Sequence, residues 1–139
     1  MLRKFHVDIT ATVGTGPWSA DTEHFSGRIL DIVWDGVIAD GHDDVTGDPD
    51  IDVEVVETGE KLWDEDDVAA AKTHRPASAV HTNDGAASTQ LDFYNLVSER
   101  LRFTVAGVTV ASAPVVGRFT VRYFDPPQDA GAGVPSVVG

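Results

Sequence analysis

Two short runs decide the fold: residues 101–105, LRFTV, and residues 118–123, RFTVRY. In each run apolar side chains occupy every second position and alternate with arginine or threonine. This period of two is typical of a β-strand with one buried face and one exposed face. The connection between the runs contains Gly107, Pro114 and Gly117, so the sequence predicts an antiparallel pair of strands with a long or bulged link.

The rest of the chain extends this pattern. Five further segments have strand-like composition or alternation, separated by glycine, proline and aspartate: residues 3–13, 25–34, 51–55, 61–63 and 89–96. Many short strands with turn signals between them indicate an all-β fold. We therefore expect an antiparallel β-sandwich, or a jelly-roll-like arrangement, of six to seven strands in one domain over residues 1–124.

One short helix is expected over residues 65–72. Asp64 is a suitable N-cap, acidic side chains fill the first turn, and Lys72 lies near the end. Negative charge at the start of a helix and positive charge at its end complement the helix dipole. Residues 73–87 are expected to be a loop, because Pro76 and Asp84-Gly85 interrupt any regular pattern.

Charge is the most distinctive feature of the composition. The 139 residues include 23 acidic and 10 basic side chains, which gives a formal net charge of −13. Such an excess destabilises a folded chain through self-repulsion in dilute salt, whereas in 1 M salt the Debye length falls to about 3 Å. Abundant aspartate, few lysines and no cysteine resemble the proteins of salt-loving organisms.

The same composition excludes several classes of function. An acidic chain is not expected to present the basic patch that nucleic acid or an anionic membrane surface requires. Without cysteine there is no disulfide framework and no thiolate metal site. The first residues enter strand alternation directly, with no apolar segment of a signal peptide, so we expect the protein to be made in the cytoplasm.

Side chains that could carry chemistry are present but show no catalytic pattern. The loop from Asp43 to Asp52 holds five aspartates that could offer oxygen ligands to a cation such as calcium, although their spacing does not match an EF-hand and a solvated loop is favoured. The five histidines lack the short spacing of a zinc helix, and no serine lies in a Gly-x-Ser-x-Gly turn. We expect no enzyme activity, no metal and no cofactor.

Other residues are candidates for contacts with another protein. Trp18, beside Pro17 in a turn, is expected to be an exposed aromatic anchor. Arginines of the last strand pair point away from the core and are expected to form one contact face for an acidic subunit, the alternative being that they pair with nearby carboxylates: Arg100, Arg102, Arg118 and Arg122. Residues 125–139 are rich in proline and glycine, and we expect an extended arm that contacts a neighbour through Pro126, Pro127 and Pro135.

A series of short motifs resembles one protein family. They are Ser26-Gly27-Arg28-Ile29-Leu30, Gly59, Leu62-Trp63, Arg75-Pro76, Asp84-Gly85, Glu99-Arg100-Leu101 and Gly117-Arg118-Phe119-Thr120-Val121. In this order they resemble the small β-rich head proteins of tailed viruses, which sit on or between major capsid subunits. The acidic charge and the C-terminal arm are not part of that pattern.

The resemblance implies a structural virion protein at the capsid surface, which binds the major capsid protein, forms a homo-oligomer and needs no cofactor. A connector or tail position on the virion is the alternative within this class. Another alternative is a β-sandwich module that binds carbohydrate or a cell surface through a row of exposed Trp and Tyr. Trp34 and Tyr123 lie in apolar register, however, which favours core packing for these two.

Overall fold

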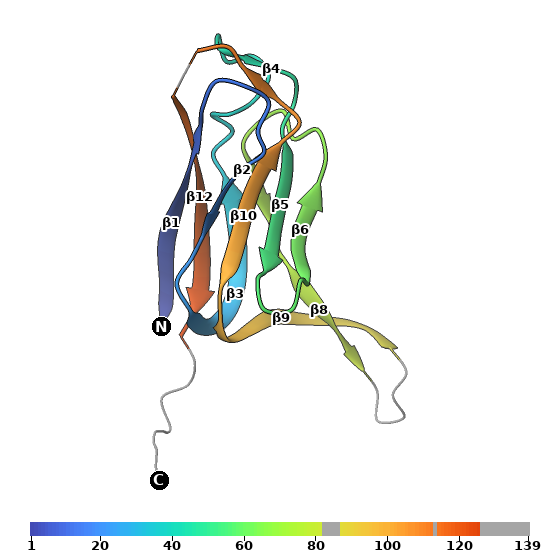
Figure 1. Cartoon of the computed structure of the whole chain (residues 1–139). Helices are drawn as coiled ribbons and strands as arrows, with labels where there is room; N and C mark the ends of the chain where they lie inside the picture. The colour runs from blue at the N-terminus through green and yellow to red at the C-terminus, as the bar shows by residue number, and fades with distance from the viewer. Residues whose placement is uncertain (82–86, 113, 126–139) are drawn as a thin grey trace.

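The computed structural model of the chain describes residues 1–81, 87–112 and 114–125, with the backbone alone for residues 77–81 and 87–92. Its strands form two antiparallel sheets that pack against each other, so the fold is all-β and sandwich-like (Figure 1). A third, two-stranded sheet lies at one end. The predicted fold class is confirmed.

The first sheet contains six strands. Its order is β1-β12-β3-β9-β8, and β7 pairs with β3 beside this path. The strands are β1 (Leu2–Ala11), β3 (Phe25–Trp34), β7 (Lys72–His74), β8 (Ala77–His81), β9 (Ala87–Glu99) and β12 (Val115–Phe124).

The second sheet contains four strands in the order β2-β10-β5-β6. They are β2 (Trp18–Asp21), β5 (Asp50–Val55), β6 (Lys61–Glu65) and β10 (Leu101–Ala106). The two-stranded sheet pairs β4 (Val45–Thr46) with β11 (Thr109–Val110). All seven predicted strand segments overlap observed strands, whereas five strands of the described structure were not predicted: β2, β4, β7, β8 and β11.

Alternating apolar side chains from the two sheets form one shared core. Phe119 of β12 is at its centre, with its ring centroid 4.8 Å from that of Trp34 in the same sheet. Across the sandwich its ring lies 5.0 Å from Phe103 and 6.3 Å from Trp63, both in the second sheet. Burying a side chain of this size stabilises the fold by about 1.5–3 kcal/mol, so this cluster helps to hold the two sheets together.

The predicted pairing of residues 101–105 with residues 118–123 is wrong. β10 pairs with β2 and β5, whereas β12 pairs with β1 and β3 in the other sheet. The connection between them includes β11, which pairs with β4 at the end of the sandwich, and there the chain crosses from one sheet to the other. Alternation shows that each run has a buried face but does not identify its partner strand.

The predicted helix over residues 65–72 is also wrong, and the described residues contain no helix. Residue Asp67 has a left-handed φ of 56°, which is incompatible with a right-handed helix. Its N–H donates to Asp50 Oδ1 at 3.1 Å, and the N–H of buried Val68 donates to the Pro49 carbonyl at 2.8 Å. These contacts with a distant loop satisfy the donors that a helical turn would have used.

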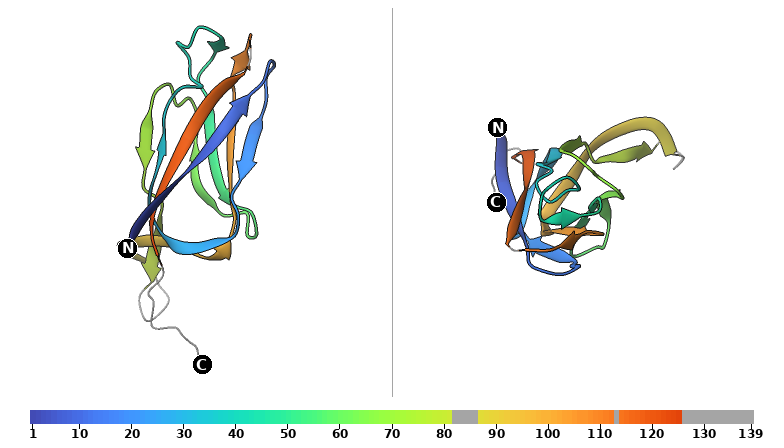
Figure 2. Two further views of the ribbon diagram at one scale, coloured as in Figure 1. Left: turned by 90° about the vertical axis from the view of Figure 1, so that its left-hand side faces the viewer. Right: turned by 90° about the horizontal axis from the view of Figure 1, so that it is seen from above.

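Residues 73–87, predicted to be a loop, include the end of β7, all of β8 and the first residue of β9. The second half of β9 pairs with β3, and its first half pairs with β8. The β8–β9 hairpin therefore projects from the sandwich, as Figure 2 shows from two further directions. The chain leaves β12 at the same end of the sandwich (Figure 1).

Candidate functional site

The four arginines predicted to form one contact face do not lie together. Arg102 lies on β10 of the second sheet, Arg100 directly precedes that strand, and Arg118 and Arg122 lie on the first sheet. Because the sheets pack face to face, the outer sides of β10 and β12 point in opposite directions. The prediction of a single arginine face is therefore wrong, for the same reason that the predicted strand pair is wrong.

Each of these arginines binds a carboxylate instead. Arg100 Nε lies 2.9 Å from Glu57, Arg102 Nε 2.9 Å from Asp21, and Arg118 Nε 2.7 Å from Asp8. Arg122 holds the buried side chain of Asp31, with Nε 2.8 Å from Oδ1. Three of the four pairs are solvent-exposed, and such pairs contribute about 0–1 kcal/mol each.

Glu57 has the most heavily bonded carboxylate of this group. The backbone N–H of Arg100 donates to its Oε1 at 2.8 Å, Arg100 Nε donates to Oε2, and His24 Nε2 lies 3.1 Å from Oε2. The backbone hydrogen bond, followed by the guanidinium, lowers the pKa of Glu57 to about 2. A depressed carboxyl pKa stabilises the fold above the ordinary value near 4.5, and this contribution is lost as pH falls towards 2.

We expect Arg100→Gln to raise the pKa of Glu57 but to leave it below 4.5, because the backbone donor remains. The measurement is a titration of the Glu57 carboxyl carbon by NMR. Arg102→Gln is the matched control, since it removes an arginine two residues further along the chain that binds Asp21 instead. An unchanged Glu57 pKa in Arg100→Gln would show that the guanidinium contributes nothing to it.

Trp18 is not the exposed aromatic anchor that the sequence predicts. It is half-buried and packs against the core, and its Nε1 donates to Thr12 Oγ1 at 3.2 Å. Of the other aromatics considered for a sugar-binding row, Trp34, Trp63 and Tyr94 are buried. Pro126, Pro127 and Pro135 lie outside the described residues, so the predicted contacts of the C-terminal arm stay a prediction.

The aspartates between Asp43 and Asp52 do not converge on one point. Asp50 accepts from the backbone of Asp67, and Asp52 binds Lys61 Nζ at 2.5 Å. Within residues 1–81, 87–112 and 114–125, no three His, Asp or Glu side chains are arranged to hold a metal ion. The segment from Asp43 to Asp52 contains β4 and the start of β5.

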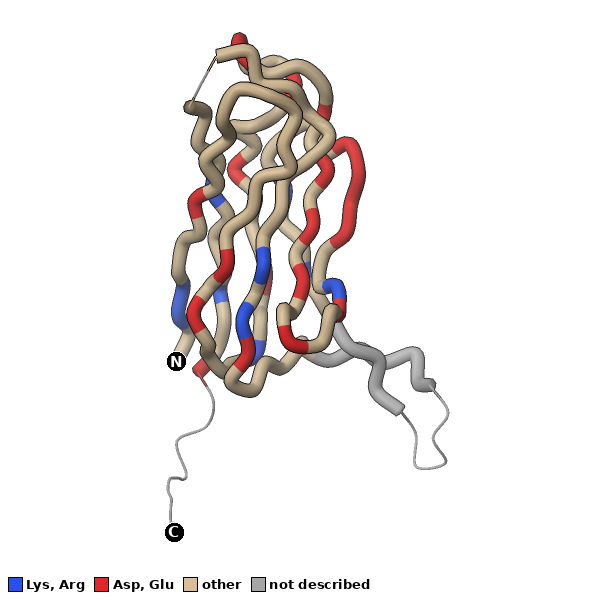
Figure 3. The backbone as a smooth tube through the Cα atoms, in the orientation of Figure 1, with Lys and Arg blue, Asp and Glu red and all other residues tan. Residues whose placement is uncertain are grey.

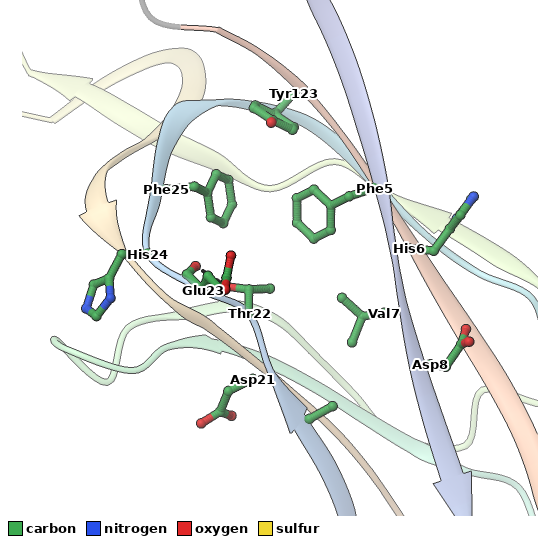
Figure 4. A pocket seen from close by; sticks show the side chains of 11 residues that line it. Phe5, His6, Val7, Asp8, Asp21, Thr22, Glu23, His24, Phe25 and Tyr123 are labelled. Atoms are coloured by element: carbon green, nitrogen blue, oxygen red, sulfur yellow. Dashed lines mark hydrogen bonds between the residues drawn. The ribbon is translucent and has the colours of Figure 1, made fainter.

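A groove of about 430 Å³ opens between β1 and the segment that runs from β2 into β3 (Figure 4). Phe5, Phe25 and Tyr123 line it, and their rings meet edge to face with centroids 5.3–5.7 Å apart. Its acidic rim residues Asp8 and Asp21 are held by Arg118 and Arg102. The groove thus has an apolar floor, and the charges of Asp8 and Asp21 at its rim are neutralised by neighbouring arginines.

Sequence reasoning did not find this groove. Its three aromatic residues come from β1, β3 and β12, which are neighbours only because of the order of strands in the sheet. Each lies on a strand that the alternation predicts, and two of the three occur in apolar register. Locally they are indistinguishable from core residues, so only the sheet order could have revealed them.

Comparison with known protein families, with curated proteins and with solved structures finds no match to this chain. The part of the chain that the structure describes contains no helix of the length and hydropathy that a membrane crossing requires.

Proposed function

We propose that this chain is a structural virion protein that decorates or stabilises the capsid of a tailed virus of a halophilic host. In this role it binds the major capsid protein at the capsid surface, as a homo-oligomer, and requires neither catalysis nor a cofactor. A connector or tail position on the virion is the alternative within the same class.

The observation that carries this proposal is a sandwich with a projecting hairpin. The two main sheets share one core, which suits a rigid building block. The β8–β9 hairpin extends beyond that core, at the end where the chain leaves β12 (Figure 1). Extended elements of this kind let one subunit reach its neighbours in a lattice. The motifs that resemble small head proteins of tailed viruses support the same role.

The experiment that tests the proposal is co-sedimentation with undecorated capsids in molar salt, where the repulsion between acidic surfaces is screened. We expect saturable binding at a fixed ratio to the major capsid protein, because a lattice offers a set number of equivalent sites. The protein sedimented alone, at the same concentrations, is the control for self-association.

Two other outcomes would reject capsid decoration. Failure to bind capsids, with a few copies per virion found by mass spectrometry, would assign the protein to the connector or tail. Failure to bind and absence from virions would leave the carbohydrate-binding or cell-surface module as the better explanation.

A further inference from the structure

The outer face of the first sheet carries more positive than negative charge. Strand register places residues side by side on this face in rows such as Lys4–Arg122–Asp31 and Asp8–Arg118. Its strand residues with described side chains include four cationic residues, Lys4, Arg28, Arg118 and Arg122, and two acidic ones, Asp8 and Asp31. In a chain with a net charge of −13, a face with an excess of cations is unexpected.

The outer face of the second sheet has the opposite balance. Register places two cationic residues there, Arg102 and Lys61, and five acidic ones, Asp21, Asp50, Asp52, Glu54 and Asp64. Both cations are held in ion pairs within this face, Arg102 with Asp21 and Lys61 with Asp52. Figure 3 shows acidic positions along β5 and β6 and in the loop that follows β6. The two faces of the sandwich are therefore electrostatically different.

Two cations of the first face have no acidic partner among the described side chains. Arg118 and Arg122 bind Asp8 and Asp31, but no carboxylate of the described side chains lies within ion-pair distance of Lys4 or Arg28. The guanidinium of Arg28 instead lies over two rings, 5.5 Å from the centroid of Phe93 and 5.7 Å from that of Phe124. Among the described side chains, neither charge is neutralised by a carboxylate.

Apolar side chains surround these cations. Phe124 stands between Leu2 and Arg28 in the sheet, and the rings of Phe93 and Phe124 lie 5.9 Å apart. Phe93 is 36% exposed and Leu2 is 47% exposed. We call Leu2, Lys4, Arg28, Phe93 and Phe124 the basic–aromatic patch. Aromatic residues and arginine are enriched at protein interfaces relative to the rest of the protein surface.

We propose that the basic–aromatic patch is the surface that docks onto an acidic region of the major capsid protein. This inference rests on the proposed function and specifies which face of the sandwich meets the capsid. Charge complementarity selects the partner: the patch offers two cations that no described carboxylate neutralises, so the surface opposite it must supply carboxylates. The patch also lies at the end from which the β8–β9 hairpin projects (Figure 2), so hairpin and patch can engage the same partner.

A second copy of this chain fits the patch less well. Its acidic surface is the outer face of the second sheet, on the opposite side of the sandwich. Contact between the first face of one copy and the second face of the next is heterologous, and it produces an open filament unless the rotation closes a ring. A capsid-bound protein is instead positioned by the lattice.

The test compares capsid binding of two charge variants in molar salt. Lys4→Gln with Arg28→Gln removes the two cations of the patch, and Lys61→Gln with Arg102→Gln removes two cations from the second face as a matched control. We expect at least tenfold weaker binding for the first variant and little change for the second. The loss persists in molar salt because salt screens charges in a dry contact much less than exposed ones.

A second comparison tests the apolar part of the patch. Phe93→Ala should weaken capsid binding about tenfold, which corresponds to about 1.4 kcal/mol. Val116→Ala is its control, because Val116 is exposed on the same outer face but pairs with Thr10 near the other end of β1. Melting temperatures of all four variants show whether each one remains folded.

The outcomes separate this inference from the proposed function. If the unmodified protein fails to bind capsids, the proposed function is wrong and this inference falls with it. If it binds, but the patch variants bind equally well or the control variants lose binding, only the assignment of the face is wrong. Self-association that the patch variants abolish, with capsid binding intact, would assign the patch to a second copy.

Discussion

Replacing Arg122 with alanine should lower the free energy of unfolding by about 3 kcal/mol. The reason is Asp31, whose side chain is 0% exposed and whose two carboxylate oxygens both accept hydrogen bonds from Arg122. Without the guanidinium, a charged group would remain buried with no partner. We place the effect at the lower end of the range for broken buried pairs because the side chain of Arg122 is itself 40% exposed, so water can enter the vacated space. Chemical denaturation in molar salt measures it.

Two variants distinguish this explanation from a general loss of surface charge. Arg118→Ala breaks a pair on the same strand, but its partner Asp8 is 47% exposed, so a loss of about 0–1 kcal/mol is expected. Adding Asp31→Asn to Arg122→Ala removes the buried charge and should recover part of the stability. Equal losses in Arg122→Ala and Arg118→Ala would show that the burial of Asp31 is energetically unimportant.

The buried pair of Arg122 and Asp31 also shows which features can be predicted from the sequence and which cannot. The alternation of residues 118–123 correctly predicts that Phe119 and Val121 face the core and that Arg122 faces outward. It does not predict that Arg122 meets a buried carboxylate on β3. A bulge interrupts the regular alternation in β3. The strand register shows it, since Arg122 pairs with Asp31 whereas the next residue, Tyr123, pairs with Ile29. A bulge shifts the pattern locally and leaves little trace in one strand's sequence.

Whether a segment forms a strand can thus be predicted from its own sequence, whereas the order of strands in a sheet cannot. Apolar side chains at every second residue indicate that a strand has one buried face, and this pattern can be read in each strand alone. The basic–aromatic patch depends on the order β1-β12-β3-β9, which brings together residues as distant in the chain as Lys4 and Phe93. The predicted arginine face failed for the same reason, because it assumed a neighbour for β10 that belongs to the other sheet.

The helix predicted over residues 65–72 failed for a different reason. Its signals were an N-cap and favourable end charges, and each of these is worth about 1 kcal/mol or less. Against them stand the burial of Val68 and backbone hydrogen bonds to Pro49 and Asp50. Local preferences of this size are overridden when the core and a neighbouring loop already hold the segment.

Replacing Gly117 with alanine should destabilise the protein by about 2 kcal/mol, within the usual range for overpacking a filled core. Gly117 lies on the inward side of β12, and a Cβ there would be 2.4 Å from Cη2 of Trp34 and 3.0 Å from Cδ1 of Ile38. Both neighbours are fully buried, and Trp34 also packs on Phe119, so neither can move aside without disturbing the core. Alanine in a strand is otherwise more favourable than glycine by roughly 0.5–1 kcal/mol. A measured loss of stability in Gly117→Ala would therefore reflect the steric clash with Trp34 and Ile38.

The clash can be isolated by repeating the substitution in a Trp34→Phe background. Phenylalanine withdraws the outer indole ring from Gly117, and among the described residues Trp34 Nε1 has no hydrogen-bond partner, so no hydrogen bond is lost with it. We expect Gly117→Ala to be at least about 1 kcal/mol less destabilising there than in the unmodified protein, a coupling of the size seen between residues in contact. Identical losses in both backgrounds would mean that Trp34 is not what excludes a side chain at position 117. Glycine at this position would then reflect the backbone of β12 rather than the indole that fills the space above it.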